Sequence, residues 1–211
     1  MSPPSAVRIV VFAKAPRPGL AKTRMIPVLG RQGAADLARR MLSEALAKAL
    51  EAKLGPVELC VSPFEDAIWA ELNICQRVII TNQGEGDLGE RMARACARVV
   101  AGGESVLLIG TDCPSCDASY LRSMAQALRT QDAVIAAAAD GGYPAIGLSR
   151  FDPYVFQGVA WSTNTVLCVT LEKFRALQWT FQVFPELHDI DEPEDLKYLP
   201  PGWVEAKHPR P

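Results

Sequence analysis

A cluster of basic residues follows the first apolar segment of the chain. The stretch KAPRPGLAKTR contains Lys14, Arg17, Lys22 and Arg24, and its Gly19 lets backbone amides approach a ligand closely. Cations and amides combined in this way bind phosphate or pyrophosphate. A Walker A loop is excluded, because alanine rather than glycine precedes Lys22. A solvated cationic loop remains the alternative interpretation.

Carboxylates follow apolar runs further along the chain. Asp112 comes directly after SVLLIG, and Asp189 and Asp191 lie two apart in LHDIDEPEDL. Residues two apart in an extended segment point to the same side, so this pair could share one hard cation. Together with the basic loop, the carboxylates predict Mg²⁺ or Mn²⁺ bound across the phosphates of a nucleotide. Each segment alone could equally be a capped turn or a solvated acidic face.

A glycine-rich stretch, DGGYPAIG, follows another apolar run. Asp140 could act as a general base, and Gly141 and Gly142 leave room for a flat ligand against the backbone. Tyr143 and Trp161 are the candidates for stacking on such a ligand. A plain tight turn and ordinary core packing are the alternatives.

The cysteines favour a reduced protein. The chain has six cysteines, spread through predicted strands and helices, as is typical of thiols in a cytosolic core. Only Cys113 and Cys116 form a C-x-x-C pair, and two histidines are too few to complete a zinc site. A thioredoxin-type site with an acid-shifted Cys113 thiol is an alternative. It would leave the basic loop without a role.

Composition limits the class of protein. With 211 residues, 49% of them hydrophobic and 22% charged, the chain is expected to form one α/β domain over residues 1–211. A net charge of −2 argues against a nucleic-acid partner. No apolar stretch approaches a membrane-spanning length, and the first residues show no cleavage-site pattern. We therefore expect a cytoplasmic protein without membrane insertion. A homodimer is compatible with this composition.

Strand-like and helix-like segments alternate along the chain. The predicted strands cover residues 7–13, 57–62, 77–81, 105–110, 132–139 and 179–185. The predicted helices cover residues 33–53, 64–72, 87–101, 117–130 with Asp117 as N-cap, 163–178, and a final acidic turn at 191–199. This alternation predicts three α/β/α layers around a mostly parallel sheet. Ligands bind at the carboxyl ends of the strands in such sheets, where the basic and acidic segments fall.

Six motifs in this order resemble the DUF2064 family of the nucleotide-diphospho-sugar transferase (GT-A) superfamily. They are FAKAPRPGLAKTRM, GDLGERM, IGTDCPSCDASYL, DGGYPAIGL, WST and DIDEPEDL. Members are often labelled as candidate glycosyltransferases. The similarity extends to phospholactate and molybdenum-cofactor guanylyltransferases, which share the K-T-R-type loop.

The resemblance implies a Rossmann-like GT-A fold with the nucleotide at the carboxyl edge of the sheet. It assigns nucleotide and phosphate contacts to Lys22, Thr23, Arg24, Gly86, Asp87 and Leu88, and we add Ala13, Lys14 and Gly19 of the first loop as expected contacts. It assigns metal ligation to Asp112 with Asp189 or Asp191, and the acceptor side to Asp140, Gly141, Gly142 and Tyr143. The stacking candidate Trp161 is expected on the same side. Pro144 departs from the family pattern and removes an amide donor from the acceptor side.

We expect a metal-dependent transferase that uses a nucleotide-activated donor. The leading hypothesis is a glycosyltransferase that transfers a sugar from a nucleoside-diphosphate sugar to a small-molecule acceptor. Asp112, Lys22, Arg24 and Asp140 would be its catalytic residues. A guanylyltransferase-like enzyme that moves a nucleoside monophosphate from a triphosphate to a phosphorylated acceptor is the alternative. A nucleotide-binding regulator without turnover is the alternative of another class.

Overall fold

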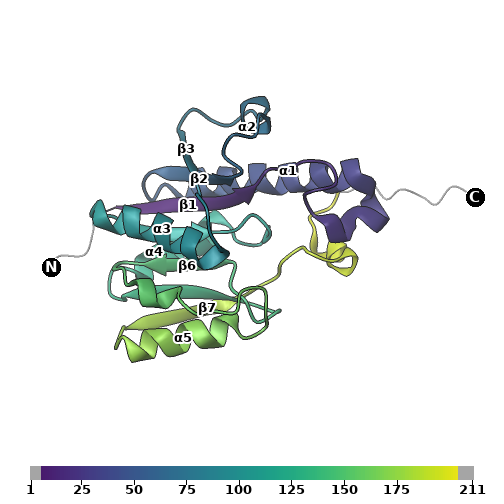
Figure 1. The fold of residues 1–211 in the computed structure, drawn as a ribbon. Helices are drawn as coiled ribbons and strands as arrows, with labels where there is room; N and C mark the ends of the chain where they lie inside the picture. Colours follow the sequence, from purple (N-terminus) through teal and green to yellow (C-terminus); the bar gives the residue numbers. More distant parts are fainter. Residues whose placement is uncertain (1–5, 204–211) are drawn as a thin grey trace, which may run out of the picture.

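The computed structural model describes residues 6–203, and its centre is a seven-stranded sheet (Figure 1). The strands are β1 (Val7–Lys14), β2 (Val57–Ser62), β3 (Val78–Asn82), β4 (Ser105–Ile109), β5 (Ala133–Ala138), β6 (Ala145–Leu148) and β7 (Phe181–Leu187). They are ordered β3-β2-β1-β4-β6-β5-β7, and the pairs are parallel except the two that β6 makes with β4 and β5. The prediction of a mostly parallel α/β sheet is confirmed.

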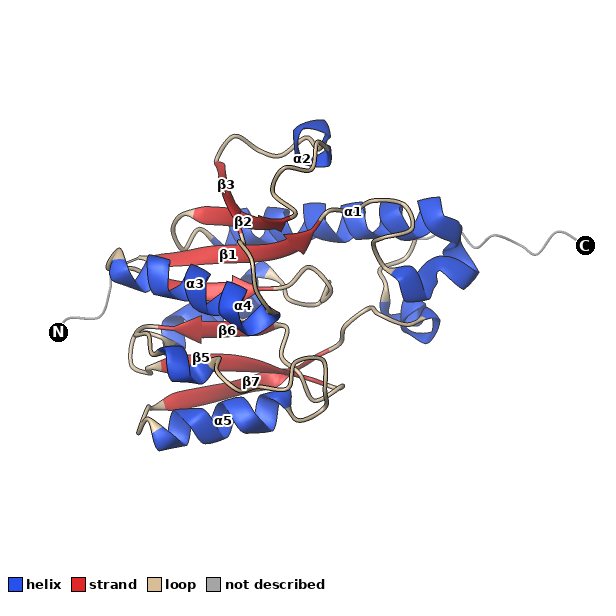
Figure 2. Ribbon diagram, viewed as in Figure 1, coloured by secondary structure: helices blue, strands red, loops and turns tan. Residues whose placement is uncertain are grey.

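Helices cover both faces of this sheet (Figure 2). They are α1 (Ile26–Ala52), α2 (Ile68–Glu71), α3 (Leu88–Ala101), α4 (Ala118–Ala127) and α5 (Val166–Ala176). Short 3₁₀ turns cover Thr23–Met25, Pro153–Val155 and Pro193–Tyr198. One core cluster joins α1 and α4 to Ile9 and Val11, whereas another joins α3 and α5 to Val10. Alternate residues of β1 thus serve opposite faces, which confirms the three-layer architecture.

Strand β6 is the main difference from the sequence prediction, which has no strand in this glycine-rich stretch. It is short and antiparallel, with Ile146 opposite both Leu108 and Ile135. Gly147 allows it to fit, because a Cβ there would lie 2.6 Å from the side chains of Leu107 and Val134. The fit of Gly147 between its two neighbouring strands therefore allows β6 to form. The β-propensity of its residues does not predict this strand.

Two helices differ from their predicted limits. The helix predicted over 33–53 already begins at Ile26 and contains a kink at Gly30, where φ is 73°. The helix predicted over 64–72 is reduced to the single turn of α2. The Asp66 carboxylate accepts a hydrogen bond from the Ile68 amide at 2.9 Å, and this local turn competes with a longer helix.

The segment after β7 returns across the molecule to the beginning of α1 (Figure 1). Ile190 is 1% exposed and packs with Met25, Leu37 and Met41 in a third core cluster. Its backbone amide donates to the Asp112 carbonyl at 2.9 Å. These contacts fix the acidic segment beside the end of β4. Among residues 6–203, no helix combines the length and hydropathy that crossing a membrane requires.

Candidate nucleotide-binding site

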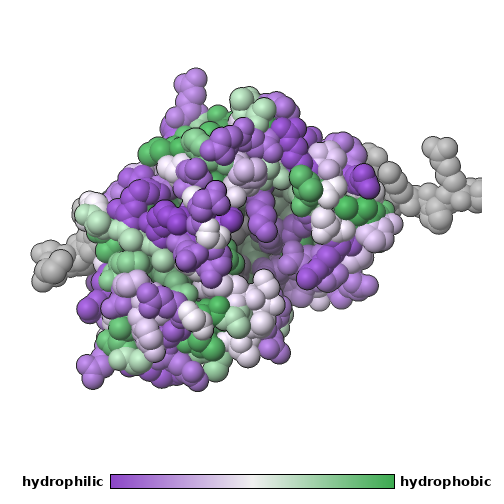
Figure 3. All heavy atoms as spheres, viewed as in Figure 1, coloured by the Kyte–Doolittle hydropathy of each residue, from purple (hydrophilic) through white to green (hydrophobic). Residues whose placement is uncertain are grey.

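A cleft of about 530 Å³ opens at the carboxyl ends of β1 and β4. From β1 the chain builds β2 and β3 on one side, and it then crosses to β4 on the other. Such a reversal of strand order leaves a crevice in which open α/β sheets bind ligands. Figure 3 shows the hollow, with mostly hydrophilic residues around it. The cleft is lined by these predicted site residues: Ala13, Lys14, Lys22, Thr23, Arg24, Leu88, Asp112, Tyr143, Asp189 and Asp191.

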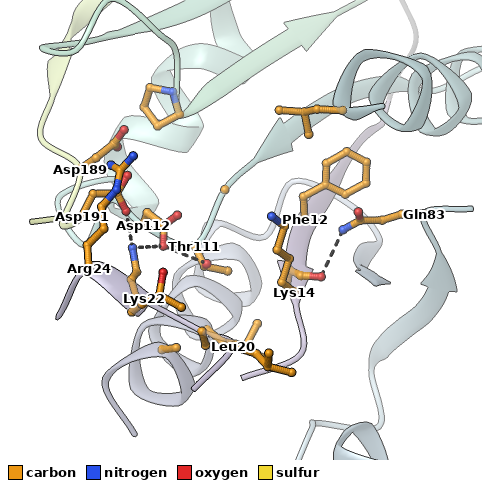
Figure 4. A pocket seen from close by; sticks show the side chains of 18 of the residues that line it. Phe12, Lys14, Leu20, Lys22, Arg24, Gln83, Thr111, Asp112, Asp189 and Asp191 are labelled. Carbon is orange, nitrogen blue, oxygen red and sulfur yellow. Dashed lines mark hydrogen bonds and ion pairs between the residues drawn. The ribbon is translucent and has the colours of Figure 1, made fainter. Parts of the chain in front are cut away.

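Lys22 lies between two carboxylates at one end of the cleft (Figure 4). Its Nζ is 2.6 Å from Asp112 Oδ1 and 2.7 Å from Asp191 Oδ1, and it donates to the Ile190 carbonyl at 2.7 Å. The three donors of the ammonium group are therefore all used. Burial opposes the charge, but the two carboxylates outweigh it and raise the pKa of Lys22. This end of the cleft thus holds a fixed ammonium ion.

The backbone around Lys22 is set by packing. Lys22 has a left-handed conformation, with φ and ψ both 47°, which costs a non-glycine residue about 1–2 kcal/mol. The 3₁₀ turn that follows ends at Met25, which is fully buried in the third core cluster. Ile190 is buried in the same cluster. One small core therefore positions the cation and the acidic segment together.

Asp189 has a different environment from Asp191. Its carboxylate accepts a hydrogen bond from the Cys113 thiol. Burial raises the pKa of Asp189 to about 6, the Cys113 thiol opposes that shift, and the charges of Asp112, Asp140 and Asp191 add to it. The acidic groups at this end therefore carry more negative charge than the Lys22 ammonium neutralises.

Asp112 and Asp191 have the chemistry to share a divalent cation. Among residues 6–203, no three histidine, cysteine or acidic side chains are placed to hold a metal ion by themselves. Magnesium, however, is commonly bound by one or two carboxylates with substrate phosphates completing its coordination. The Asp112 and Asp191 side chains are 45% and 46% exposed and converge on one cation. A metal held jointly with a ligand fits this pair, and ligation by Asp112, Asp189 and Asp191 stays a prediction.

The four cations of the first loop do not converge. Arg17 is directed to Asp66, with Nε 2.9 Å from Oδ1, and it is not among the residues that line the cleft. Arg24 is largely exposed at the rim and lies 3.1 Å from the Glu192 carboxylate. Lys14 lines the cleft and makes no ion pair within residues 6–203. Gly19, with φ of 81°, shapes the turn but does not line the cleft.

The GDL segment has a mainly architectural role. Asp87 is the N-cap of α3 and forms a capping box with Glu90, in which both hydrogen bonds measure 2.8 Å. Gly86 has φ of 103°, and a Cβ there would collide with the Glu90 carboxylate. Only Leu88 lines the cleft. Nucleotide contacts by Gly86 and Asp87 stay predictions, and the structure shows that both residues position Leu88.

The residues expected on the acceptor side fall into two groups. Tyr143 and Pro144 line the cleft. Asp140 and Gly142 instead close a turn behind them, in which the Gly142 amide donates to Asp140 Oδ1 at 2.8 Å. A Cβ on Gly141 would collide with the backbone of Asn164. Gly141 therefore joins two loops, and the general-base role of Asp140 stays a prediction.

Trp161 supports Tyr143 from outside the cleft. The two rings meet edge to face, with centroids 6.4 Å apart. The indole also packs closely against Gly89, where a Cβ would lie 2.6 Å from its Nε1. Trp161 is not among the lining residues, so stacking of Trp161 on a ligand stays a prediction.

Three lining residues at the other end of the cleft, Phe12, Gln83 and Met92, were not predicted from the sequence. Figure 4 shows Phe12 and Gln83 across the cavity from Lys22 and the carboxylates. A polar residue shortly after the strand predicted at 77–81 was the available signal for Gln83. Phe12 and Met92 follow the ordinary patterns of core residues, so nothing in the sequence marks them.

The C-x-x-C pair lacks the properties of a redox site. Cys113 and Cys116 are both buried free thiols. Burial raises the pKa of Cys116 to about 12 and, with the adjacent Asp189, raises that of Cys113 as well. The acid-shifted Cys113 thiol that the redox alternative requires is therefore not supported, because such a thiol needs a positive environment.

Comparison with known proteins shows the family of this chain. The model of a family described as an uncharacterized protein conserved in bacteria (DUF2064) matches residues 45–163, more than half of the chain. The chain belongs to the DUF2064 family. No protein of curated function matches it significantly.

Solved structures share the fold of this DUF2064 chain. A candidate nucleotide-diphospho-sugar transferase from Desulfovibrio desulfuricans G20 is 32% identical over 88% of this chain and 82% of its own, with a TM-score of 0.82. A 4-diphosphocytidyl-2C-methyl-D-erythritol synthase from Anaerococcus prevotii DSM 20548 is 12% identical over 92% and 93%, with a TM-score of 0.61. The manganese complex of Rv0371c from Mycobacterium tuberculosis H37Rv is 17% identical over 92% and 97%, with a TM-score of 0.51.

Proposed function

We propose that this DUF2064 protein is a metal-dependent glycosyltransferase that uses a nucleoside-diphosphate sugar. The observation that carries the proposal is the division of one cleft into a charged end and an apolar end. Phosphates suit the end that contains Lys22 and the carboxylates, and a nucleoside suits the end beside Phe12, where Lys14 also lies (Figure 4). The similarity to the Desulfovibrio nucleotide-diphospho-sugar transferase, at 32% identity, supports this assignment.

A divalent cation fits the charged end as a partner of the donor. Asp112 and Asp191 would hold Mg²⁺ or Mn²⁺, which supplies neutralisation of the negative charge on the diphosphate. The manganese complex of the structurally similar Rv0371c supports this choice of cofactor. Burial is the main cause of the raised pKa of Asp189, and the charges of Asp112, Asp140 and Asp191 add to it.

The cations of the chain would act on the leaving group. The Lys22 ammonium is already buried and oriented beside Asp112 and Asp191. A metal taken up by these two carboxylates would release the donors of this ammonium to stabilise charge on a departing diphosphate. Arg24 lies at the rim of the same end, and Lys14 lies beside Phe12; both positive charges would attract the phosphates. Asp140 stays the proposed general base toward an acceptor hydroxyl beside Tyr143.

Nucleotidyl transfer is the second candidate function. The similarity of fold to the diphosphocytidyl-methylerythritol synthase supports it. Lys14, Lys22 and Arg24 also suit a triphosphate as well as a diphosphate. In this reaction the leaving group would be pyrophosphate instead of a nucleoside diphosphate.

The two functions are separated by their products. The protein is incubated with nucleoside-diphosphate sugars or with nucleoside triphosphates, with and without Mn²⁺, and with a panel of sugar and phosphorylated acceptors. Release of nucleoside diphosphate supports glycosyl transfer, whereas pyrophosphate supports nucleotidyl transfer. Asp112→Asn should abolish the activity, and Arg17→Met should retain it because Arg17 is directed to Asp66. Metal-dependent binding without any product would support the regulator, and absence of binding would refute all three.

A further inference from the structure

Gln83 is a buried polar side chain at the apolar end of the cleft. It follows β3, is only 5% exposed and lines the cavity. Its side chain lies beside Phe12 and away from the acidic groups (Figure 4). Phe12, Leu88 and Met92 are apolar lining residues of the same cleft, and Lys14 lies beside Phe12 and Gln83 (Figure 4). A buried amide in such surroundings needs partners for both its nitrogen and its oxygen.

The orientation of the Gln83 amide is fixed by two backbone carbonyls. Its Nε2 donates to the Ala13 carbonyl at 3.1 Å and to the Cys60 carbonyl at 2.9 Å. Because an amide nitrogen carries two protons, both are used. The reverse orientation would place the amide oxygen against two carbonyl oxygens and is therefore excluded. The backbone of Gln83 is also held, by a 3.0 Å bond to the Val61 carbonyl and by Arg94.

The amide oxygen is the one group of this side chain left to interact with a ligand. Within residues 6–203, no group donates a hydrogen bond to Gln83 Oε1, whereas both of its nitrogen protons have acceptors. Among residues 6–203 this oxygen is not one of the fully buried side-chain atoms without a partner, so it stays accessible from the cleft. A fixed, accessible acceptor can discriminate between ligands, because a ligand without a matching donor covers it and leaves it unsatisfied. Phe12 and Leu88 provide the apolar surface on which a flat ring would lie.

We propose that Gln83 Oε1 accepts a hydrogen bond from an N–H group on the edge of the donor's nucleobase. This inference rests on the proposed function and adds a specificity-determining residue to it. The phosphates occupy the Lys22 end of the cleft, and the base occupies the Phe12 end. The site then accepts bases with a free N–H on the edge that faces Gln83, and it rejects bases in which that position is alkylated.

Matched nucleotides test this hydrogen bond directly. Binding of ADP, GDP, CDP and UDP is first measured by calorimetry with Mn²⁺, to find the preferred base. The preferred diphosphate is then compared with its analogue lacking the N–H donors of that edge: N6,N6-dimethyladenosine, N1,N2,N2-trimethylguanosine, N4,N4-dimethylcytidine or N3-methyluridine diphosphate. The wild-type protein should bind the analogue roughly tenfold or more weakly than the parent.

The variant Gln83→Met separates the hydrogen bond from the bulk of the added methyl group. Methionine has a similar length but offers no comparable acceptor. The variant should bind parent and analogue with nearly equal affinity, because the acceptor that discriminates between them is absent. Gln182→Met, at an exposed position on β7, should keep the wild-type ratio. Because each ratio compares two ligands on one protein, a change in stability does not alter the conclusion.

Each outcome has one meaning. Equal binding of parent and analogue by the wild type would refute the role of Gln83 and leave the proposed function intact. Discrimination that persists unchanged in Gln83→Met would also refute it, since bulk alone would then explain the effect. If none of the four diphosphates binds, the proposed function and this inference both fail.

Discussion

Lys22 is the most deeply buried of the cations that line the cleft. Its ammonium satisfies Asp112 and Asp191 at once, and its backbone is held in a conformation that lysine rarely adopts. The charge is kept although the side chain is only 9% exposed. A residue held in this way has two opposite effects: it attracts phosphate, and it competes with any metal for the same two carboxylates.

Replacement of Lys22 should therefore change two affinities in opposite directions. Lys22→Met should weaken binding of a nucleoside diphosphate about tenfold or more, because a desolvated cation is lost from the phosphate end. It should strengthen binding of Mn²⁺ alone about tenfold, a change equivalent to ~1.4 kcal/mol, because Asp112 and Asp191 lose the ammonium. Titration calorimetry measures both affinities.

Arg17→Met is the matched control for this prediction. It removes one cation from the same loop, but Arg17 pairs with Asp66 away from the cleft. Both affinities should stay close to those of the wild type. Unchanged Mn²⁺ binding in Lys22→Met would show that Asp112 and Asp191 are not the metal site.

At the scale of elements, the walls of the cleft depend on glycines at loop contacts. The turn between β5 and β6 lies against the loop before α5, and the Leu167 amide donates to the Gly141 carbonyl at 2.9 Å. Gly141 has φ of 84°, and its missing side chain leaves room for the backbone of Asn164. This contact supports the turn from which Tyr143 reaches the cleft.

Two alanine variants measure that contact. Gly141 and Gly103 have almost the same φ, 84° and 82°, but no atom lies within 4 Å of a Cβ on Gly103. Gly103→Ala should lower the free energy of unfolding by about 1 kcal/mol from backbone strain alone. Gly141→Ala adds a collision with backbone and should cost roughly 2–4 kcal/mol. Urea unfolding compares them, and equal losses would refute the role of close packing.

The elements that sequence predicted well share a local cause. Strands β1, β2 and β4 are rich in aliphatic residues, as is typical of buried parallel strands, although β1 contains Arg8 and β2 contains Glu58. Asp117 caps α4 as predicted, by accepting a bond from the Tyr120 amide at 2.7 Å. Strand β6 could not be predicted in the same way. Its cause is the fit of Gly147 among residues distant in sequence.

The same distinction applies to the candidate site. Lys22, Asp112 and Asp191 were recognisable because charged residues at strand ends carry a chemical signal. Arg17 carries the same signal, but its partner Asp66 lies beyond β2 and could not be foreseen. Gln83 has its role only through the carbonyls of Ala13 and Cys60, which tertiary structure places around it.

At the scale of the whole molecule, one ligand should connect three separate parts of the chain. The cleft draws residues from the end of β1, from the beginning of α3 and from the segment after β7. Binding a nucleoside diphosphate with its metal would therefore tie together segments from both halves of the sequence. Ligand binding should therefore raise the free energy of unfolding of the whole domain, and unfolding should stay a single transition.

Thermal unfolding tests this coupling. A nucleoside diphosphate at about 100 times its dissociation constant, with Mn²⁺, should add ~2.7 kcal/mol of stability. For a chain of this size the unfolding temperature should rise by roughly 5–10 °C. Chelation of the metal with EDTA should remove most of the rise, because phosphate binding beside Asp112 and Asp191 then loses its counter-charge. A rise that is equally large in EDTA would contradict the metal requirement.

The antiparallel strand β6 has a consequence for how this protein could diversify. Because β5 and β6 are hydrogen-bonded neighbours, the turn that bears Asp140 and Tyr143 is pinned at both ends to the same sheet. A change in the length or composition of that turn leaves the register of the parallel strands unaltered. The sequence of the β5–β6 turn could therefore vary while the rest of the sheet stays the same. Such variation would change which acceptor the cleft binds and would leave nucleotide binding unchanged.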